Sequence, residues 1–262
     1  ARHRLSSASH RSATQMLRSA IAVWRVVRLV IHAVHGLLVV LLRFPSLTPE
    51  QQQARIQAWS LQLLACAGVT LEVRGTPVVT GPALMVSNHI SWLDIPVLHA
   101  ARYCRFISKS DVKDWPIVGT LATAAGTLYI ERASRRDALR MVQSMHDSLV
   151  QREVLAVFPE GTTGDGRELL PFHANLLQAA ISADACVQPV AIQFFDRAGE
   201  PSLIPCYVGS DTLIASLWRI VCAQGLVVRV SFGIPQKAGD RTRQEWADAV
   251  RAAVSVMRHT PA

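Results

Sequence analysis

From Val69 onward, short apolar runs alternate with segments of helical periodicity, and this alternation constrains the fold more than any other feature of the chain. Strands that alternate with helices build an α/β domain whose sheet is largely buried. We therefore predict an α/β fold over residues 68–262, a mixed sheet flanked by helices. The predicted strands are 70–73, 83–87, 104–108, 127–131, 154–158, 187–194 and 226–232, and the predicted helices are 94–101, 116–124, 135–151, 174–182, 212–222 and 243–257.

The formal charge of +8 on 262 residues comes from the N-terminus, where residues 1–43 contain seven Arg and no acidic residue. The other 219 residues hold 20 Lys and Arg against 19 Asp and Glu. We treat residues 1–19 as a basic arm. Such an arm is typical of proteins that bind nucleic acid or an anionic membrane, or of a targeting peptide. The apolar segment that follows favours the membrane, and we expect no nucleic-acid partner.

Residues 20–67 predict an amphipathic helical hairpin in front of the α/β domain. Arg25, Arg28, His32 and His35 share one helix face, and the opposite face is Val, Leu and Ile, as in helices that lie in a lipid interface. The longest run without Lys or Arg, residues 29–42, would be roughly 21 Å long, short of the ~30 Å hydrocarbon core. The alternatives are a buried core helix, a spanning helix and, for residues 1–20, a mitochondrial transit peptide.

The second helix of the hairpin is predicted from about 49 to 67. Thr48 is a suitable N-cap, Pro49 suits the first helical position, and Gly68 ends the pattern. Within the main domain, Ser134 with Asp137 has the spacing of a capping box, as does the pair Thr242 and Glu245.

Two segments carry more polar residues than a core or a simple turn requires. In the first, an apolar strand ends in Asn88-His89, and a helix begins near Asp94. The spacing of five residues allows the Asp94 carboxylate to accept from one imidazole nitrogen and to leave the other as a base. A capping aspartate beside an unrelated histidine is the alternative.

The second segment, residues 158–168, follows the buried strand 154–158 and contains three glycines and two threonines. Glycines let backbone N–H groups approach an anion closely, and the hydroxyls of Thr162 and Thr163 add donors. Among the other histidines, His99 is expected on a helix surface, and His173 follows this segment closely enough to contact a ligand.

Together these segments resemble the glycerolipid acyltransferase family typified by bacterial 1-acyl-glycerol-3-phosphate acyltransferase. The family's N-H-x-x-x-x-D block stands at residues 88–94, and its F-P-E-G-T block at residues 158–162. A glycine followed by an apolar strand ending in Arg stands at 126–132, and an apolar stretch around a proline at 187–191. The order and the spacing fit over roughly residues 69–235, and a membrane-bound helical hairpin is also what the resemblance implies.

The resemblance implies acyl transfer from an acyl thioester, carried by coenzyme A or acyl carrier protein, to the free hydroxyl of a lysophospholipid. His89 would be the general base and Asp94 would orient it. The implied substrate-binding residues are Asn88, Lys109, Arg132, Glu160, Gly161, Thr162 and Thr163. Within this set, Arg132 and the 161–163 loop would hold a phosphate, Glu160 would position the acceptor hydroxyls, and Lys109 would add charge near the oxyanion.

One departure concerns the acceptor. The family's F-P-E-G-T block often continues with Arg-Ser, whereas Thr163-Gly164 follows here, so that a cation is missing. This leaves open a lyso-ornithine lipid or another lyso-lipid as acceptor. A thioester hydrolase, in which His89 would activate water, is the alternative outside the class.

No metal site is expected, because the five cysteines are scattered without a C-x-x-C pair. No cofactor is expected either, and the sequence contains no G-x-G-x-x-G or Walker A motif. We expect membrane lipids and the acyl carrier as partners. The expected location is the cytoplasmic face of a bacterial inner membrane, where the protein would be monotopic or held by one spanning helix.

Overall fold

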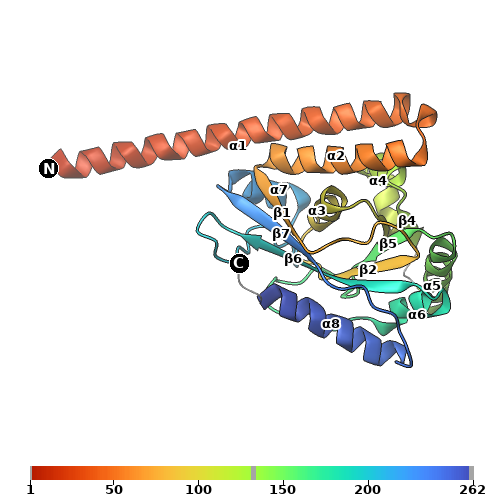
Figure 1. The fold of residues 1–262 in the computed structure, drawn as a ribbon. Helices are drawn as coiled ribbons and strands as arrows, with labels where there is room; N and C mark the ends of the chain where they lie inside the picture. The colour runs from red at the N-terminus through yellow and green to blue at the C-terminus, as the bar shows by residue number, and fades with distance from the viewer. Residues whose placement is uncertain (1, 131–133, 260–262) are drawn as a thin grey trace.

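In a computed structural model that describes residues 2–130 and 134–259, a seven-stranded sheet lies at the centre, in the order β1-β7-β6-β2-β5-β3-β4 (Figure 1). The strands β6, β2, β5, β3 and β4 run parallel to one another, whereas β7 pairs antiparallel with β6, and β1 follows β7. The predicted mixed sheet is thus confirmed. Its strands are β1 (Val69–Arg74), β2 (Ala83–Ser87), β3 (Arg105–Lys109), β4 (Leu128–Ile130), β5 (Val154–Val157), β6 (Cys186–Phe195) and β7 (Leu226–Phe232).

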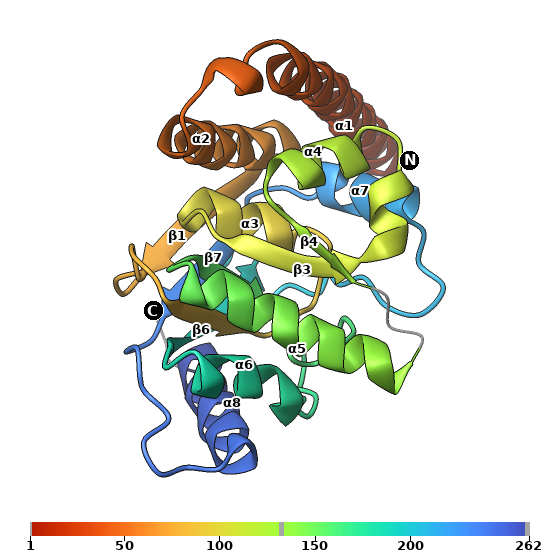
Figure 2. The same ribbon diagram turned by 90° about the vertical axis from the view of Figure 1, so that its right-hand side faces the viewer.

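Helices cover both faces of the sheet (Figure 2). One face carries α3 (Asp94–Ala101), α4 (Val118–Ala124) and α7 (Leu213–Cys222), with α1 (Arg2–Leu42) and α2 (Pro49–Ala67) outside them. The other face carries α5 (Arg135–Val150), α6 (Leu177–Ser182) and α8 (Arg243–His259). The part of the chain that the structure describes also contains three short 3₁₀ helices: η1 (Phe44–Ser46), η2 (Ser110–Asp114) and η3 (Ala174–Leu176).

Each face of the sheet has its own hydrophobic core because side chains alternate along a strand. On the central strand β2, Met85 belongs to the core under α3 and α7. Its neighbours Leu84 and Val86 belong to the core under α5, α6 and α8. All three are 0% exposed, which explains why this strand reads as an uninterrupted apolar run.

The helix ends predicted at Thr48, Gly68 and Ser134 are confirmed. Thr48 and Gln51 form a capping box at the start of α2, and Gly68 ends that helix with a left-handed φ of 80°. At the start of α5, the Ser134 side chain accepts from the backbone N–H of Asp137.

The N-terminal arm and the first helix of the hairpin form one continuous helix, α1, and α2 folds back along its C-terminal half (Figure 1). Gly36 permits this close approach, because a Cβ there would lie 2.3 Å from the Trp59 ring nitrogen. The Trp59 Nε1–H donates to the carbonyl of His32 at 3.2 Å, and the two rings stack with centroids 4.9 Å apart.

The basic face of α1 is turned toward the protein at Arg25, whereas its apolar face is exposed. Arg25 turns toward the domain and donates to the carbonyls of Val221 and Ala223 at the end of α7. A cation at that position satisfies carbonyls that the helix leaves without partners and favours the negative end of its dipole. The opposite, apolar face of α1 is exposed, and it includes Val23, Trp24, Val27, Val30, Ile31, Val34, Leu38 and Leu41.

Candidate active site

The two polar segments that the sequence singles out meet at one edge of the sheet. Because β2, β5 and β3 are parallel neighbours, the residues that follow each of them gather at the same carboxyl edge. The segment 88–94 follows β2, the segment 158–168 follows β5, and Lys109 ends β3. Arg132, which follows β4 in the sequence, lies outside the described residues.

His89 and Asp94 form a hydrogen-bonded pair, with 2.8 Å between Nδ1 and Oδ2. The same carboxylate oxygen accepts the backbone N–H groups of Ile90 at 2.7 Å and Ser91 at 2.9 Å. Asp94 is the first residue of α3 and is fully buried, so both the turn and the helix dipole hold its negative charge in place. Because Nδ1 is bound to the carboxylate, Nε2 is the ring nitrogen that can accept a proton.

The His89 ring is fixed from its face as well. It stacks on Phe158 with ring centroids 4.0 Å apart and 9° between the planes, and Phe158 stacks in turn on Phe106 of β3. The His89 side chain remains 18% exposed, so the imidazole is not fully enclosed. An oriented carboxylate, a packed face and one accessible nitrogen are what a general base requires.

Glu160 joins the two polar segments. Its Oε1 accepts the backbone N–H of His89 at 2.8 Å, and its Oε2 accepts the N–H of Leu170 at 2.9 Å. A second bond runs the other way, from the N–H of Gly164 to the carbonyl of His89 at 2.8 Å. Burial raises the pKa of Glu160, and the two backbone N–H groups oppose that shift. The carboxylate is thus used to position His89, and its predicted contact with acceptor hydroxyls stays a prediction.

Asn88 is also held by the backbone. Its side-chain amide donates to the carbonyl of Ile192 at 3.0 Å and accepts the N–H of the same residue at 2.8 Å. The residue is 0% exposed. These bonds tie the end of β2 to the middle of β6, so the geometry favours a positioning role over direct contact with substrate.

The remaining predicted binding residues lie on the surface of the same edge. Gly161 and Thr162 are exposed, and Gly161 has a left-handed φ of 72° that favours glycine. The Thr163 hydroxyl donates to the carbonyl of Tyr207, which links this loop to the segment after β6. Lys109 is exposed at the end of β3.

Of two other histidines, His99 is buried and His173 is exposed. His99 is not on a surface, as the sequence predicts, but 6% exposed, and its Nε2 bonds to the carbonyl of Cys104 at 3.0 Å. Burial lowers the pKa of His99 to about 4. His173 is exposed beside Gly161, where an added Cβ would lie 3.1 Å from its Nε2.

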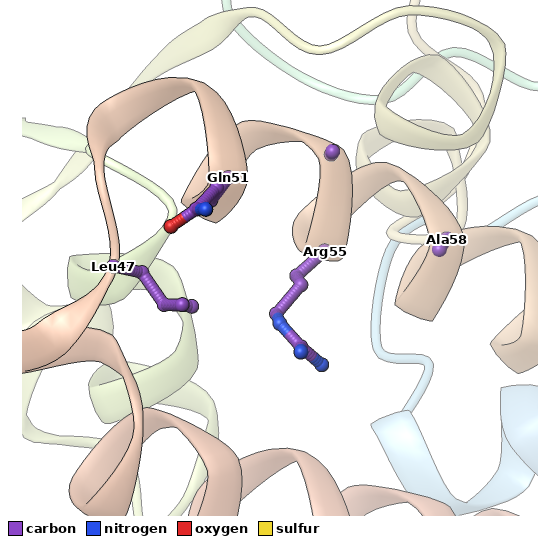
Figure 3. Close-up of a pocket in the computed structure, with 5 residues that line it drawn as sticks. Leu47, Gln51, Arg55 and Ala58 are labelled. Carbon is purple, nitrogen blue, oxygen red and sulfur yellow. The ribbon is translucent and has the colours of Figure 1, made fainter.

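Two grooves lie along the hairpin rather than at His89. One, of about 320 Å³, is lined by side chains of α2 and of the turn before it (Figure 3), namely Leu47, Gln51, Ala54, Arg55 and Ala58. The other, of about 600 Å³, lies between the hairpin turn and α4. Among the described residues, no group of three or more His, Cys, Asp or Glu side chains is placed to hold a metal ion.

Comparison with known proteins agrees with this geometry. The sequence model of the family described as Acyltransferase matches residues 70–193. A lyso-ornithine lipid O-acyltransferase from Pseudomonas aeruginosa is 36% identical over 217 residues, which are 81% of this chain and 81% of that protein. The chain belongs to the acyltransferase family. A second relative of this acyltransferase, a 1-acyl-sn-glycerol-3-phosphate acyltransferase from Neisseria meningitidis, is 37% identical over 70% of the chain and 72% of its own length.

A solved structure shares the fold of this acyltransferase. The crystal structure of a 1-acyl-sn-glycerophosphate acyltransferase from Thermotoga maritima aligns with a TM-score of 0.61 at 18% identity, over 91% of this chain and 99% of that chain. The predicted family and fold are therefore confirmed.

Sequence reasoning missed three contacts of the site. It treated Phe158 only as part of a motif, because its stacking partner His89 lies 69 positions earlier in the chain. Trp92 Nε1 donates to the Ser216 hydroxyl of α7 at 3.1 Å, and Leu170 donates to Glu160. These last two bonds join residues that no sequence spacing relates.

Proposed function

We propose that this acyltransferase moves a fatty acyl group from an acyl thioester to the free hydroxyl of a lysolipid, with 1-acyl-glycerol-3-phosphate as the acceptor. The observation that carries the proposal is the 2.8 Å bond between His89 Nδ1 and Asp94 Oδ2, beside a loop joined to the His89 backbone. Relatives named for acylation of two different lysolipids support the reaction class.

In the proposed mechanism the acceptor hydroxyl gives its proton to His89 Nε2 as its oxygen attacks the thioester carbonyl carbon. Asp94 keeps Nδ1 protonated and stabilises the imidazolium that forms. The tetrahedral oxyanion accepts from backbone N–H groups at the sheet edge, with the charge of Lys109 nearby. The C–S bond then breaks, the imidazolium returns the proton to the thiolate, and the thiol carrier leaves. No covalent enzyme intermediate is needed.

The test of this proposal is product analysis with purified enzyme, an acyl-coenzyme A or acyl carrier protein donor, and lysophosphatidic acid. We expect phosphatidic acid, and His89→Ala should abolish it in a folded protein. A general base is worth about 10²–10⁴-fold. Free fatty acid as the main product would instead indicate a thioester hydrolase. Comparing the two donors in the same assay identifies the carrier.

Lyso-ornithine lipid is the second candidate acceptor, and the loop after Thr162 favours it. The position that often holds a cation in the family is Thr163 here, and its hydroxyl is bonded to Tyr207. If a phosphate is bound, Arg132→Ala should raise the acceptor KM roughly tenfold to a hundredfold, since a charged hydrogen bond is worth ~1.5–3 kcal/mol. An unchanged KM, together with faster acylation of lyso-ornithine lipid, would select the second acceptor.

The helix α1 contains one stretch, Arg18–Leu42, that is long and apolar enough to cross a membrane. Its 25 residues would extend roughly 37 Å. This length is enough to cross the hydrocarbon core, although the run 29–42 without Lys or Arg is too short by itself. We infer nevertheless that the protein is monotopic. The same stretch packs against α2 and α7 through Arg25, His32 and Gly36, which leaves only its outer apolar face for lipid. A location on the cytoplasmic face of the bacterial inner membrane is part of the same proposal.

A further inference from the structure

Two arginines on the C-terminal helix α8 reach the loop that follows the F-P-E-G-T block. Arg251 donates from Nε to the carbonyl of Leu170 at 3.0 Å and from Nη2 to the carbonyl of Leu169 at 2.5 Å. Arg258, two turns further along the same helix, donates to the carbonyl of Gly166. Both side chains thus bind backbone carbonyls of one short loop.

The helix that carries these arginines is itself firmly placed. Trp246, Val250 and Val254 of α8 are all 0% exposed in the core beneath the sheet. The Gln193 side chain of β6 donates to the carbonyl of Arg258 near the end of the helix. Figure 1 shows α8 lying along the face of the sheet opposite the hairpin. The arginines therefore attach the loop to a helix that is itself fixed by the core.

The same loop holds the catalytic histidine by its backbone. The N–H of Leu170 donates to Glu160, which accepts the N–H of His89 on its other oxygen, at 2.9 and 2.8 Å. The N–H of Gly164 donates to the carbonyl of His89 at 2.8 Å. Both main-chain groups of His89 are thus bonded to the segment 160–170, whose carbonyls α8 binds.

We propose that Arg251 and Arg258 are positioning residues, which set the place of His89 and of the exposed Gly161-Thr162 turn through this hydrogen-bonded chain. The matched family region ends at residue 193, so that α8 lies outside it. Arg258 also brings a positive charge close to Glu160 and Asp165. A guanidinium suits this task because its fixed fork can bind two carbonyls at once.

The first test measures hydrogen exchange and does not depend on activity. In Arg251→Met, we expect roughly tenfold faster exchange in peptides covering 160–172 and 84–94, and unchanged exchange in peptides from β7. Arg243→Met, an exposed arginine at the start of the same helix, is the matched control and should change neither. Unchanged exchange in both site peptides, or faster exchange over the whole chain, would overturn the proposal.

The second test rests on the acyl transfer proposed above and separates kcat from KM. A shift of His89 by ~1 Å can cost about 10²-fold, so we expect Arg251→Met to lower kcat at least about tenfold with the donor KM within about twofold. Arg251→Lys, which keeps a cation and one donor, should restore part of the loss. If Arg251→Met does not fold, the lysine variant and Arg258→Met decide. A parent-like kcat in folded Arg251→Met and Arg258→Met would contradict the positioning role. An inactive parent enzyme would contradict the proposed function, and the hydrogen-exchange result alone would then decide whether the arginines position His89.

Discussion

The backbone N–H of His89 donates to Oε1 of Glu160 at 2.8 Å, across 71 residues of chain. This bond connects two sequence blocks that also meet in the stacking of His89 on Phe158 and in the bond from the N–H of Gly164 to the carbonyl of His89. It also explains why the second block contains a carboxylate that is 5% exposed, since a buried acceptor with two oxygens can serve two backbone donors at once.

Replacing Glu160 by Gln tests this use of the carboxylate. The amide keeps the shape of the side chain, but its NH₂ group cannot accept, so one buried N–H loses its partner at a cost of about 1–3 kcal/mol. We expect kcat to fall roughly tenfold to a hundredfold, because either the His89 backbone or the Leu170 end of the chain that positions it loses its bond to residue 160. Steady-state kinetics on protein whose thermal unfolding is cooperative would check it. Glu168→Gln, an exposed acidic residue of the same loop, is the control.

Asp94→Asn separates charge from shape at the hydrogen-bonded pair of His89 and Asp94, the proposed general base and its orienting carboxylate. The asparagine oxygen can still accept the N–H groups of Ile90 and Ser91, so the turn should fold as in the parent. It supplies no negative charge for the imidazolium, and we expect kcat to fall by about 10²–10⁴-fold. The comparison is Asp248→Asn on the exposed side of α8. A loss in Asp94→Asn of less than about tenfold would mean that His89 works without its carboxylate.

The fold was largely predictable from the sequence because strands and helices here have clear periods and ends. Leu84, Met85 and Val86 predict a strand buried on both faces, and Thr48, Ser134 and Gly68 mark helix ends by their own chemistry. The pairing of His89 with Asp94 was predictable for the same reason, since a turn of five residues brings the two side chains together.

The uses of Arg25, His99 and Glu160 were not predictable, because each depends on a partner far along the chain. The helical period places Arg25 on a polar stripe but cannot tell whether lipid or protein covers that stripe. In the sequence, His99 is a polar residue on a short helix, and only the structure shows that it is bonded to the carbonyl of Cys104. The partners of Glu160 are backbone N–H groups, which every residue has and no sequence pattern marks.

His99 should make the stability of the protein depend on pH. Burial lowers its pKa to about 4, whereas the unfolded chain has a value near 6.5. Between these values the unfolded state binds more protons, so stability is lost as the pH falls from 6.5 to 4. The loss should reach about 3 kcal/mol, at about 1.4 kcal/mol for each pKa unit. Urea unfolding at several pH values would measure this slope, and His99→Gln, which keeps a donor for Cys104, should flatten it. An equal slope in both proteins would assign the effect to another group.

The proposed monotopic arrangement predicts which arginines of α1 contribute to membrane binding. Arg18 is exposed and Arg28 is half-buried, so both can approach an anionic lipid surface. Each such cation contributes about 1 kcal/mol, and replacing both by Gln should weaken binding to anionic vesicles roughly 30-fold at low salt. The loss should shrink at high salt, because screening removes the same attraction from the parent.

Arg25→Gln is the matched control, because this arginine faces the protein. It should leave vesicle binding near the parent value and lower the thermal stability instead, since the carbonyls of Val221 and Ala223 lose their charged donor.

The substitutions Trp24→Ser and Ile31→Ser, on the exposed apolar face, should weaken vesicle binding at every salt concentration, because salt does not screen the burial of apolar area. A protein that stays bound to vesicles in all these variants, and that is released only by detergent, would instead be held by a spanning helix. The packing of Arg25 against α7 would then have to open in the membrane.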